Sequence, residues 1–311
     1  MEARADFMAS KTLLSRAAGL VRHVDVEPLV ASAGTFIGRS VDLGWGRVYG
    51  GQTMAQGLAA CQRLAPGRAI HQFGCHFLRG GRVDQDIRFE AEALTSGQSF
   101  SVVHCRALQE TKPILVMTAS LQSPEVGMEH QEQPGLRPEW GRPEDLASFG
   151  ELMAPFMERV PKPLRAIYSQ GQPIEMRPVE FIAPWDAKLR PPSRAVWMRM
   201  RAQLPDDPQV HERLLTYISD WGLLETSLQP HPTAFSRPDM QMASLSHSIH
   251  FHQPFRLDRQ WICHAMHSPV SSGARGYTLG EFWTEDGVLV ASTAQESLIR
   301  RKENTAHNIV R

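Results

Sequence analysis

The sequence predicts an α+β fold made of two copies of one unit, each a long helix wrapped by an antiparallel β-sheet. The last third of the chain is a degenerate repeat of the first third, visible when one is slid over the other without gaps. A shift of 174 residues, the difference between Phe77 and Phe251, also places residues 114–116 (Ile-Leu-Val) on residues 288–290 (Val-Leu-Val). Each third contains one helical segment followed by four β-rich runs. A single sheet has an apolar face that needs cover, and one long helix packed on it supplies that cover.

In the first copy, the segment at residues 52–64 that follows Gly50 and Gly51 is predicted to be the helix. Lys112 and Pro113 are expected to form a turn before the last strand of this copy. The predicted strands of the first copy, including one before the helix, are residues 35–41, 71–78, 86–95, 100–109 and 114–122.

In the second copy, the segment headed by Asp220 is predicted to be the helix, over residues 220–228. The sequence Glu-Asp-Gly at residues 285–287 indicates a hairpin turn between the last two strands. An additional strand at residues 175–182 is expected to open this copy and to correspond to residues 35–41. The strands expected after the helix are residues 244–252, 261–268, 276–285 and 288–299.

These elements divide the 311 residues into five parts. The part between the two copies is dense in proline and charge, which is typical of a connector. A helical stretch within it, residues 146–160, is expected to pack across the domains, because a structureless connector of this length would be unusual. The expected parts are an N-terminal segment (1–24), a first domain (25–125), the connector (126–172), a second domain (173–303) and a C-terminal tail (304–311).

The composition argues against several classes of ligand and location. Lysine and arginine total 33, as do aspartate and glutamate, so no surface for nucleic acid or for an anionic membrane is indicated. The four cysteines lack metal-type spacing and are predicted to be reduced thiols. No apolar run approaches the length of a membrane-spanning helix, and the first 24 residues lack the features of a secretory signal. We therefore expect a cytoplasmic protein, with a mitochondrial presequence as the open alternative.

Five motifs in order along the chain together resemble the acyl-CoA thioesterase II family, which includes bacterial and peroxisomal enzymes. The resemblance covers about residues 36 to 300 and implies a double hotdog fold, with two hotdog domains in one chain. The motifs are Val-Tyr-Gly-Gly-Gln (48–52), His-Phe-Leu-Arg (76–79), Tyr-Ile-Ser-Asp (217–220), Ala-Ser-Leu-Ser-His-Ser (243–248) and Val-Ala-Ser-Thr-Ala-Gln-Glu (290–296).

The resemblance implies a catalytic set of Asp220, Ser244 and Gln295 that holds an attacking water, with Asp220 as the base and no covalent acyl-enzyme. Each residue also has a structural interpretation. Asp220 stands where an N-cap would be expected, Ser244 could be a hydroxyl at a strand edge, and Gln295 could face solvent. Helix N–H groups would lower the pKa of Asp220, whereas burial near an acyl chain would raise it.

Substrate-binding residues are expected at Gly51, Gln52 and Arg275. Paired glycines before a helix permit a tight entry, and they can also let a ligand approach the backbone. N–H groups at the start of that helix, at Gly51 or its neighbours, are candidate donors to the thioester oxygen. Arg275 lies in a Ser-x-Ala-Arg-Gly segment similar to one in the family and could meet a CoA phosphate, an internal acid or a surface partner.

The repeat predicts one catalytic site per chain, in the second copy. The shift of 174 residues maps Ser244 onto Ile70 and Gln295 onto Leu121, neither of which can hold a water. A shift of 168 maps Asp220 onto Gln52. The first copy is therefore expected to serve as a structural partner that completes the cleft.

The histidines between His247 and His252 could suggest a metal site, but no cysteine, aspartate or glutamate nearby completes one. The family pattern needs no metal and no cofactor other than the CoA of the substrate. The chain departs from the family at His250 and Gln253, where tryptophan and arginine are common, and at Gly80, where proline is usual. These changes leave the acyl preference open.

The predicted function is hydrolysis of acyl-CoA to a free acid and CoA, with small-molecule acyl-CoA as the ligand and a homo-oligomer as a possible assembly. Two alternatives stay open. One is a non-catalytic module that binds or senses acyl-CoA, and the other is an enoyl-CoA hydratase or dehydratase of the same fold, because fold does not determine function.

Overall fold

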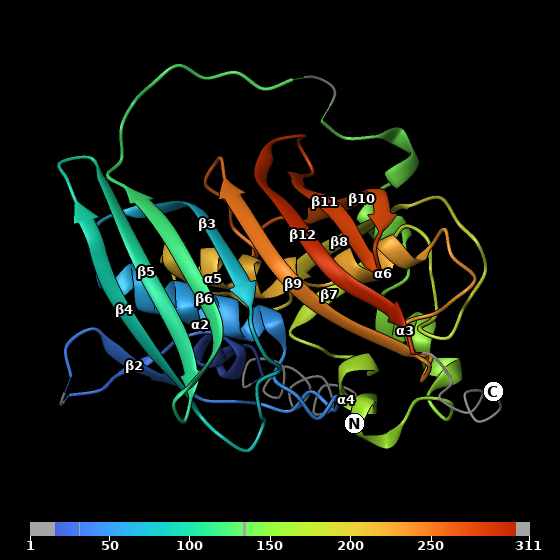
Figure 1. Cartoon of the computed structure of the whole chain (residues 1–311). Helices are drawn as coiled ribbons and strands as arrows, with labels where there is room; N and C mark the ends of the chain where they lie inside the picture. The colour runs from blue at the N-terminus through green and yellow to red at the C-terminus, as the bar shows by residue number, and fades with distance from the viewer. Residues whose placement is uncertain (1–15, 31, 133–134, 303–311) are drawn as a thin grey trace, which may run out of the picture.

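A twelve-stranded antiparallel sheet forms the framework of the computed structural model, which describes residues 16–30, 32–132 and 135–302 (Figure 1). The strands lie in the order β1-β2-β4-β5-β6-β3-β9-β12-β11-β10-β8-β7. Their bounds are β1 Glu27–Pro28, β2 Thr35–Gly38, β3 Ala69–Phe77, β4 Ile87–Ser96, β5 Phe100–Gln109, β6 Lys112–Gln122, β7 Ile174–Pro178, β8 Ser193–Met200, β9 Met240–Phe251, β10 Ile262–Ser272, β11 Arg275–Thr284 and β12 Leu289–Arg301.

The two halves of the sheet repeat one topology and join where β3 pairs with β9. The order β2-β4-β5-β6-β3 in the first half corresponds to β8-β10-β11-β12-β9 in the second. At the junction Gly74 pairs with Ser248, which is also the residue that the shift of 174 places on it. A residue can pair with its equivalent in the other copy only where the twofold axis that relates the two copies passes between the strands. The internal repeat and the α+β double hotdog fold are therefore confirmed.

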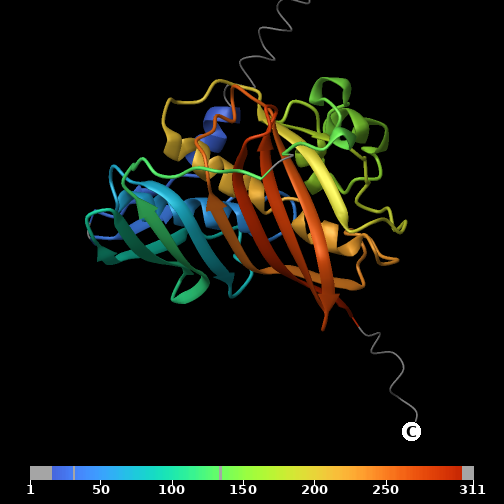
Figure 2. The same ribbon diagram turned by 90° about the horizontal axis from the view of Figure 1, so that it is seen from above.

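The helices lie on one side of the curved sheet (Figures 1 and 2). Helix α2 (Gly50–Arg63) crosses the first half, the short helix α6 (Leu223–Leu228) packs on β10, β11 and β12, and α5 (Pro208–Ser219) packs on α2. Residues 51–62 of α2 are all buried. Small side chains such as Ala55 and Ala59 let this helix lie close to both the sheet and α5.

Eight of the predicted strands are confirmed to within a few residues, because their apolar residues alternate and their turns are marked by glycine or charge. The predicted turn at Lys112 and Pro113 is wrong. Both residues belong to β6, and the turn falls on Glu110 and Thr111, with Glu110 at a φ of 55°. The turn predicted at residues 285–287 is present, with Gly287 at a φ of 82°.

The helix predicted at residues 220–228 is wrong in extent. The main helix of the second copy is α5, which begins after Asp207, whose side chain accepts from the Gln209 backbone N–H at 3.0 Å, and has Pro208 in its first turn. Both are start signals that the prediction overlooked. Gly222, at a φ of 90°, then separates α5 from α6.

The prediction for the start of the second copy also needs correction. Strand β7 covers Ile174–Pro178, not residues 175–182, and it lies at the edge of the sheet as β1 does. The counterpart of β2 is β8, which the sequence reasoning did not find. Its run Ala195 to Met198 is buried without alternation, so the two-residue period that marks a half-exposed strand is absent.

The connector consists of short helical pieces that pack against the second half. A small apolar cluster around Met153, Val160 and Tyr168 holds it in place, and Ser148 and Glu151 form a capping box at the start of α3. Within residues 16–302, leaving out the uncertain positions, no helix is long and apolar enough to cross a membrane. Residues 1–15 of the N-terminal segment and the tail at 304–311 lie outside the described residues. The helical pieces are α3 Phe149–Met153, α4 Arg165–Tyr168 and the 3-10 turns Pro138–Trp140, Pro143–Asp145, Ala154–Phe156 and Lys162–Leu164.

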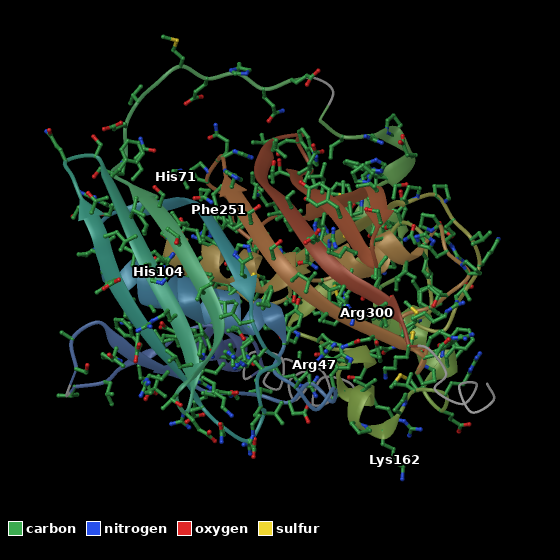
Figure 3. All side chains as sticks on the ribbon, viewed as in Figure 1. Arg47, His71, His104, Lys162, Phe251 and Arg300 are labelled. Carbon is green, nitrogen blue, oxygen red and sulfur yellow. The ribbon has the colours of Figure 1, made fainter. Side chains whose placement is uncertain are left out.

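The outer face of the sheet carries many polar side chains (Figure 3). His104 lies over the strands of the first half, and His71 and Phe251 lie near the junction between the halves. The core lies on the opposite side of the sheet, where the helices pack.

Candidate active site

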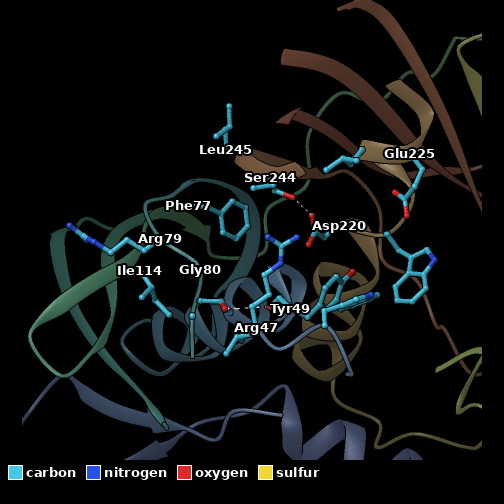
Figure 4. A pocket seen from close by; sticks show the side chains of 18 of the residues that line it. Arg47, Tyr49, Phe77, Arg79, Gly80, Ile114, Asp220, Glu225, Ser244 and Leu245 are labelled. Carbon is cyan, nitrogen blue, oxygen red and sulfur yellow. Dashed lines mark hydrogen bonds between the residues drawn. The ribbon is translucent and has the colours of Figure 1, made fainter. Parts of the chain in front are cut away.

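A cavity of about 280 Å³ opens where the start of α2 meets the segment between α5 and α6 (Figure 4). Two of the three predicted catalytic residues, Asp220 and Ser244, line it. Its walls are mainly apolar and aromatic, with two arginines at the mouth. The lining includes Trp45, Arg47, Tyr49, Gly50, Phe77, Arg79, Ile114, Tyr168, Trp221, Glu225, Phe235 and Leu245.

Asp220 caps a helix, but not the helix that the sequence suggested. It is the C-cap residue of α5, and its Oδ2 atom accepts from the Gly51 backbone N–H of α2 at 3.0 Å. Helix α2 has Tyr49 as its N-cap, with no side-chain cap bond and no acidic residue in its first turn. The carboxylate of the second copy therefore provides the negative charge that the start of the first-copy helix lacks.

The two glycines at the start of α2 are required by this contact. A Cβ atom on Gly50 would lie 2.6 Å from Asp220 Oδ2, and one on Gly51 would lie 2.3 Å from the Tyr217 carbonyl oxygen. Both distances are shorter than van der Waals contact allows. The Tyr49 hydroxyl also donates to the Tyr217 carbonyl at 3.0 Å, so the two helix ends are tied together beside Asp220.

A chain of hydrogen bonds joins the three predicted catalytic residues. Ser244 Oγ donates to Asp220 Oδ1 at 3.0 Å, and Gln295 Nε2 donates to Ser244 Oγ at 3.3 Å. The Gln295 side chain is buried rather than facing solvent, and it also donates to Ser297 Oγ at 3.1 Å. The structure thus brings together three residues that are far apart in the sequence.

His247 is part of the same network, although the sequence reasoning considered it only as a metal ligand. Its Nδ1 atom lies 2.8 Å from Gln295 Oε1, and its Nε2 atom lies 3.0 Å from Ser219 Oγ. His247 lies on β9 three residues after Ser244. The sequence signal that could have identified it is its place in the same Ala-Ser-Leu-Ser-His-Ser motif as Ser244.

The protonation state of His247 fixes which group donates and which accepts in each hydrogen bond from His247 to Asp220. Burial lowers the pKa of His247 to about 4, so the ring is neutral near pH 7. Because an amide oxygen can only accept, Nδ1 must carry the ring proton. The Gln295 amide is then held with its NH₂ group toward Ser244, and Ser244 is left to donate to Asp220.

The electrostatics make Asp220 a stronger base than a free aspartate. Burial, together with the nearby charge of Glu225, raises the pKa of Asp220 from 3.8 to about 7. The hydrogen bonds from Ser244, Gly51 and Gln295 act in the opposite direction. Of the two opposing effects expected from the sequence, desolvation prevails.

Two of the predicted substrate-binding residues do not reach the cavity. Arg275 lies at the start of β11 and forms an exposed ion pair with Glu296 at 2.8 Å. Gln52 is fully buried, and its amide donates to the Arg39 carbonyl at 3.0 Å. Gly51 does contact the site, but its N–H group is already used by Asp220 and is not free for a substrate oxygen.

The first copy has apolar residues where the second has the polar network. Ile70, Leu121 and Phe73 correspond to Ser244, Gln295 and His247 under the shift of 174, and all three are buried in the hydrophobic core. Phe73 stacks on His247 across the junction, with ring centroids 6.3 Å apart. This contrast supports a single water-binding site in each chain.

His250 at the end of β9 and His252 just after it do not complete a metal site. His252 Nε2 bonds Ser292 Oγ at 2.9 Å on the outer face of the sheet. In the portion of the chain that the structure describes, no group of three or more histidine, cysteine, aspartate or glutamate residues is arranged to hold a metal ion.

Sequence comparison identifies two matching families. Residues 165–298 match the family described as acyl-CoA thioesterase, and residues 41–122 match the acyl-CoA thioesterase N-terminal domain. Acyl-CoA thioesterase 2 of Haemophilus influenzae is 35% identical over 86% of this chain and 93% of its own length. Human acyl-coenzyme A thioesterase 8 is 32% identical over 92% of this chain and 90% of its own length.

Solved structures give the same similarity. An acyl-CoA thioesterase II from Mycobacterium marinum superposes with a TM-score of 0.71 at 29% identity, covering 91% of this chain and 98% of that one. A hot dog fold protein from Alicyclobacillus acidocaldarius has a TM-score of 0.68 at 19% identity, covering 90% of this chain and 97% of that one. The second similarity is evidence for the fold alone.

Proposed function

The chain belongs to the acyl-CoA thioesterase II family, a family of thioester hydrolases. We propose that it cleaves acyl-CoA by direct attack of a water held by Asp220, Ser244 and Gln295. The observation that carries this proposal is the hydrogen-bonded chain from Gln295 through Ser244 to a buried Asp220 with a raised pKa. The relatives, which are acyl-CoA thioesterases, support the activity, and this geometry supports the assignment of the residues.

The proposed chemistry needs one base and no covalent intermediate. Ionised Asp220 accepts a proton from the water as the water oxygen adds to the thioester carbon. Ser244 orients the water by a hydrogen bond, and Gln295, whose amide donates to Ser244 and Ser297, holds the Ser244 hydroxyl in place. The tetrahedral intermediate then collapses, the carbon–sulfur bond breaks, and the proton held by Asp220 passes to the CoA thiolate. A base with a pKa of about 7 suits this double role, because it can both take and return a proton near neutral pH.

The thioester oxygen gains negative charge during this step and needs a donor. The Gly50 N–H group stands at the start of α2, at a cavity-lining position one residue before the N–H that Asp220 uses. The helix dipole favours an anion at this end of α2. We assign the oxyanion to this donor, and loss of one such donor costs about 3 kcal/mol of transition-state stabilisation in other hydrolases.

The charges around the cavity suggest how the substrate lies. Arg47 and Arg79 are exposed at its mouth, and arginine suits the phosphates of CoA. In Figure 4 Asp220 and Ser244 lie between Arg79 on one side and Glu225 on the other. The proposed substrate therefore enters with CoA beside the arginines, its thioester at Asp220 and its acyl group directed toward Glu225 and Trp221.

The proposal includes a cytoplasmic location and no added cofactor. All four cysteines are buried and unpaired, which is compatible with a reducing compartment. Assembly into a homo-oligomer also stays a proposal, with the two edge strands β1 and β7 as the candidate contacts.

Release of free thiol from a series of acyl-CoAs tests the function, with the wild-type protein compared with Asp220→Asn. The proposal expects turnover by the wild type, a loss of about a thousandfold or more in the variant, and similar acyl-CoA binding by both. Binding without turnover by the wild type would instead support a sensor. A hydratase would add water across a double bond without releasing thiol, which the same assay separates.

A further inference from the structure

A histidine and a threonine on the inner face of the second half of the sheet are buried without a hydrogen-bond partner. His264 of β10 is 0% exposed and Thr293 of β12 is 3% exposed. Among the described residues, neither ring nitrogen of His264 has a partner, and the Thr293 hydroxyl has none either. An unpaired buried polar group is costly, and most such groups in folded proteins are bonded to protein or to ordered water. The pair therefore indicates a ligand that can form hydrogen bonds.

The two side chains meet over Gly280 of β11, the strand that lies between β10 and β12. Thr293 is directly opposite Gly280 in the ladder of β11 and β12. His264 is opposite Phe282 and stacks on its ring, with the centroids 4.1 Å apart. A Cβ atom on Gly280 would lie 2.5 Å from Thr293 Oγ1 and 2.6 Å from His264 Nε2. The hydroxyl and the ring nitrogen thus converge beside a residue that has no side chain.

The ligand that suits this place is a single water molecule. Burial lowers the pKa of His264 to about 3, so the ring is neutral near pH 7 and does not attract an anion. A water both donates and accepts, so it can bond the hydroxyl and the ring nitrogen whichever nitrogen carries the proton. Two polar partners are enough to hold an internal water. A metal ion would need further ligands, and the part of the chain that the structure describes has no group of residues arranged to supply them.

This place is separate from the cavity at Asp220. The residues that line that cavity do not include His264, Gly280 or Thr293. Thr293 lies two residues before Gln295 on the same strand, and both side chains are buried on its inner face. A ligand bound here would therefore support the strand that carries Gln295 without touching the substrate.

We propose that His264 Nε2 and Thr293 Oγ1 hold an internal water that ties β10 to β12 across Gly280. Such a bridge joins two strands that are not neighbours in the sheet, because β11 separates them. It also gives a reason for glycine at position 280, since a side chain there would occupy the place of the water. The inference does not depend on the proposed thioesterase function.

A high-resolution crystal structure of the full-length wild-type protein tests the proposal directly. A solvent peak is expected within about 2.7–3.2 Å of both Thr293 Oγ1 and His264 Nε2. Thr293→Ser, which keeps the hydroxyl, should retain the peak.

Thermal unfolding of Thr293→Val tests the same bridge, because valine keeps the shape of threonine and removes the hydroxyl. With a bound water, the variant leaves it a single partner, and the Tm is expected to fall by about 2–4 °C. Without one, valine replaces an unpaired buried hydroxyl, and the Tm should rise. Thr278→Val on β11 is the matched control, since its hydroxyl donates directly to the Leu223 carbonyl at 2.9 Å and its loss gives the scale of the effect.

A wild-type crystal structure without this peak would overturn the proposal. So would a Tm of Thr293→Val equal to or above that of the wild type, because the hydroxyl would then have had no partner. The crystal structure decides the question alone if Thr293→Val does not fold.

Discussion

Replacing Asp220 by asparagine is expected to make the protein more stable at alkaline pH while it abolishes activity. Burial holds the folded-state pKa of Asp220 at about 7 against 3.8 for the free side chain. An acid whose pKa is raised by folding contributes stability that is complete below the unfolded-state pKa and is lost as pH rises through the folded-state pKa. The ionised form of Asp220, which catalysis requires, therefore lowers the free energy of unfolding.

The magnitude follows from linkage. A shift of about three pKa units costs up to about 4 kcal/mol at about pH 8 and about 2 kcal/mol at about pH 5. Asparagine does not titrate, but it cannot accept both hydrogen bonds that Asp220 accepts from Gly51 and Ser244, which costs about 1 kcal/mol at any pH. The free energy of unfolding of Asp220→Asn, relative to wild type, should therefore increase by about 2–3 kcal/mol between about pH 5 and about pH 8.

Urea unfolding of both proteins at the two pH values measures this difference, and other titrating groups cancel to first order because both proteins share them. Activity measured on the same samples shows whether stability and turnover change in opposite directions. A difference in unfolding free energy that stays constant with pH would refute the raised pKa, and with it the argument that desolvation prevails over the helix N–H group.

Three further predictions concern residues around this centre. His247→Phe should lower kcat by about a hundredfold with little change in KM, because it leaves the Gln295 amide unoriented without altering the cavity wall; an unchanged kcat would exclude a positioning role. Gly51→Ala should destabilise the protein by about 1–3 kcal/mol through a clash with a carbonyl 2.3 Å away, whereas Gly57→Ala, whose nearest neighbour is at 3.5 Å, should be neutral or slightly stabilising in thermal unfolding. Arg275→Ala should change kcat/KM for acyl-CoA by no more than about twofold, since its ion pair is exposed, and a large rise in KM would return this arginine to the CoA site.

Much of the fold was predictable because its signals are local and repeated. The alternating strands and the 174-residue repeat both survive in the structure, down to the pairing of Gly74 with Ser248 at the junction. The parts that were wrong either lack such signals or contain signals that the prediction overlooked. Strand β8 is buried on both faces and does not alternate. Helix α5 was missed although Asp207 and Pro208 mark its start.

The sequence singled out three residues that the structure brings together, but it did not predict the contacts between them. Asp220, Ser244 and Gln295 stand in recognisable motifs, and the structure places them in hydrogen-bond contact. That Asp220 caps α2 of the other copy depends on how the two halves dock, which no local pattern encodes. The role of His247 depends on the same tertiary contact, since its partner Gln295 is 48 residues away in the sequence.

Direct attack by water is the central claim, and a single turnover in ¹⁸O-labelled water tests it most directly. With enzyme in excess over a good acyl-CoA substrate, mass spectrometry would follow the label in both the released acid and the peptide that contains Asp220. If Asp220 acts as a base, the label appears in the acid and the peptide stays unlabelled. Label in the Asp220 carboxyl group together with an unlabelled acid would show that Asp220 attacks the thioester itself, which contradicts the account.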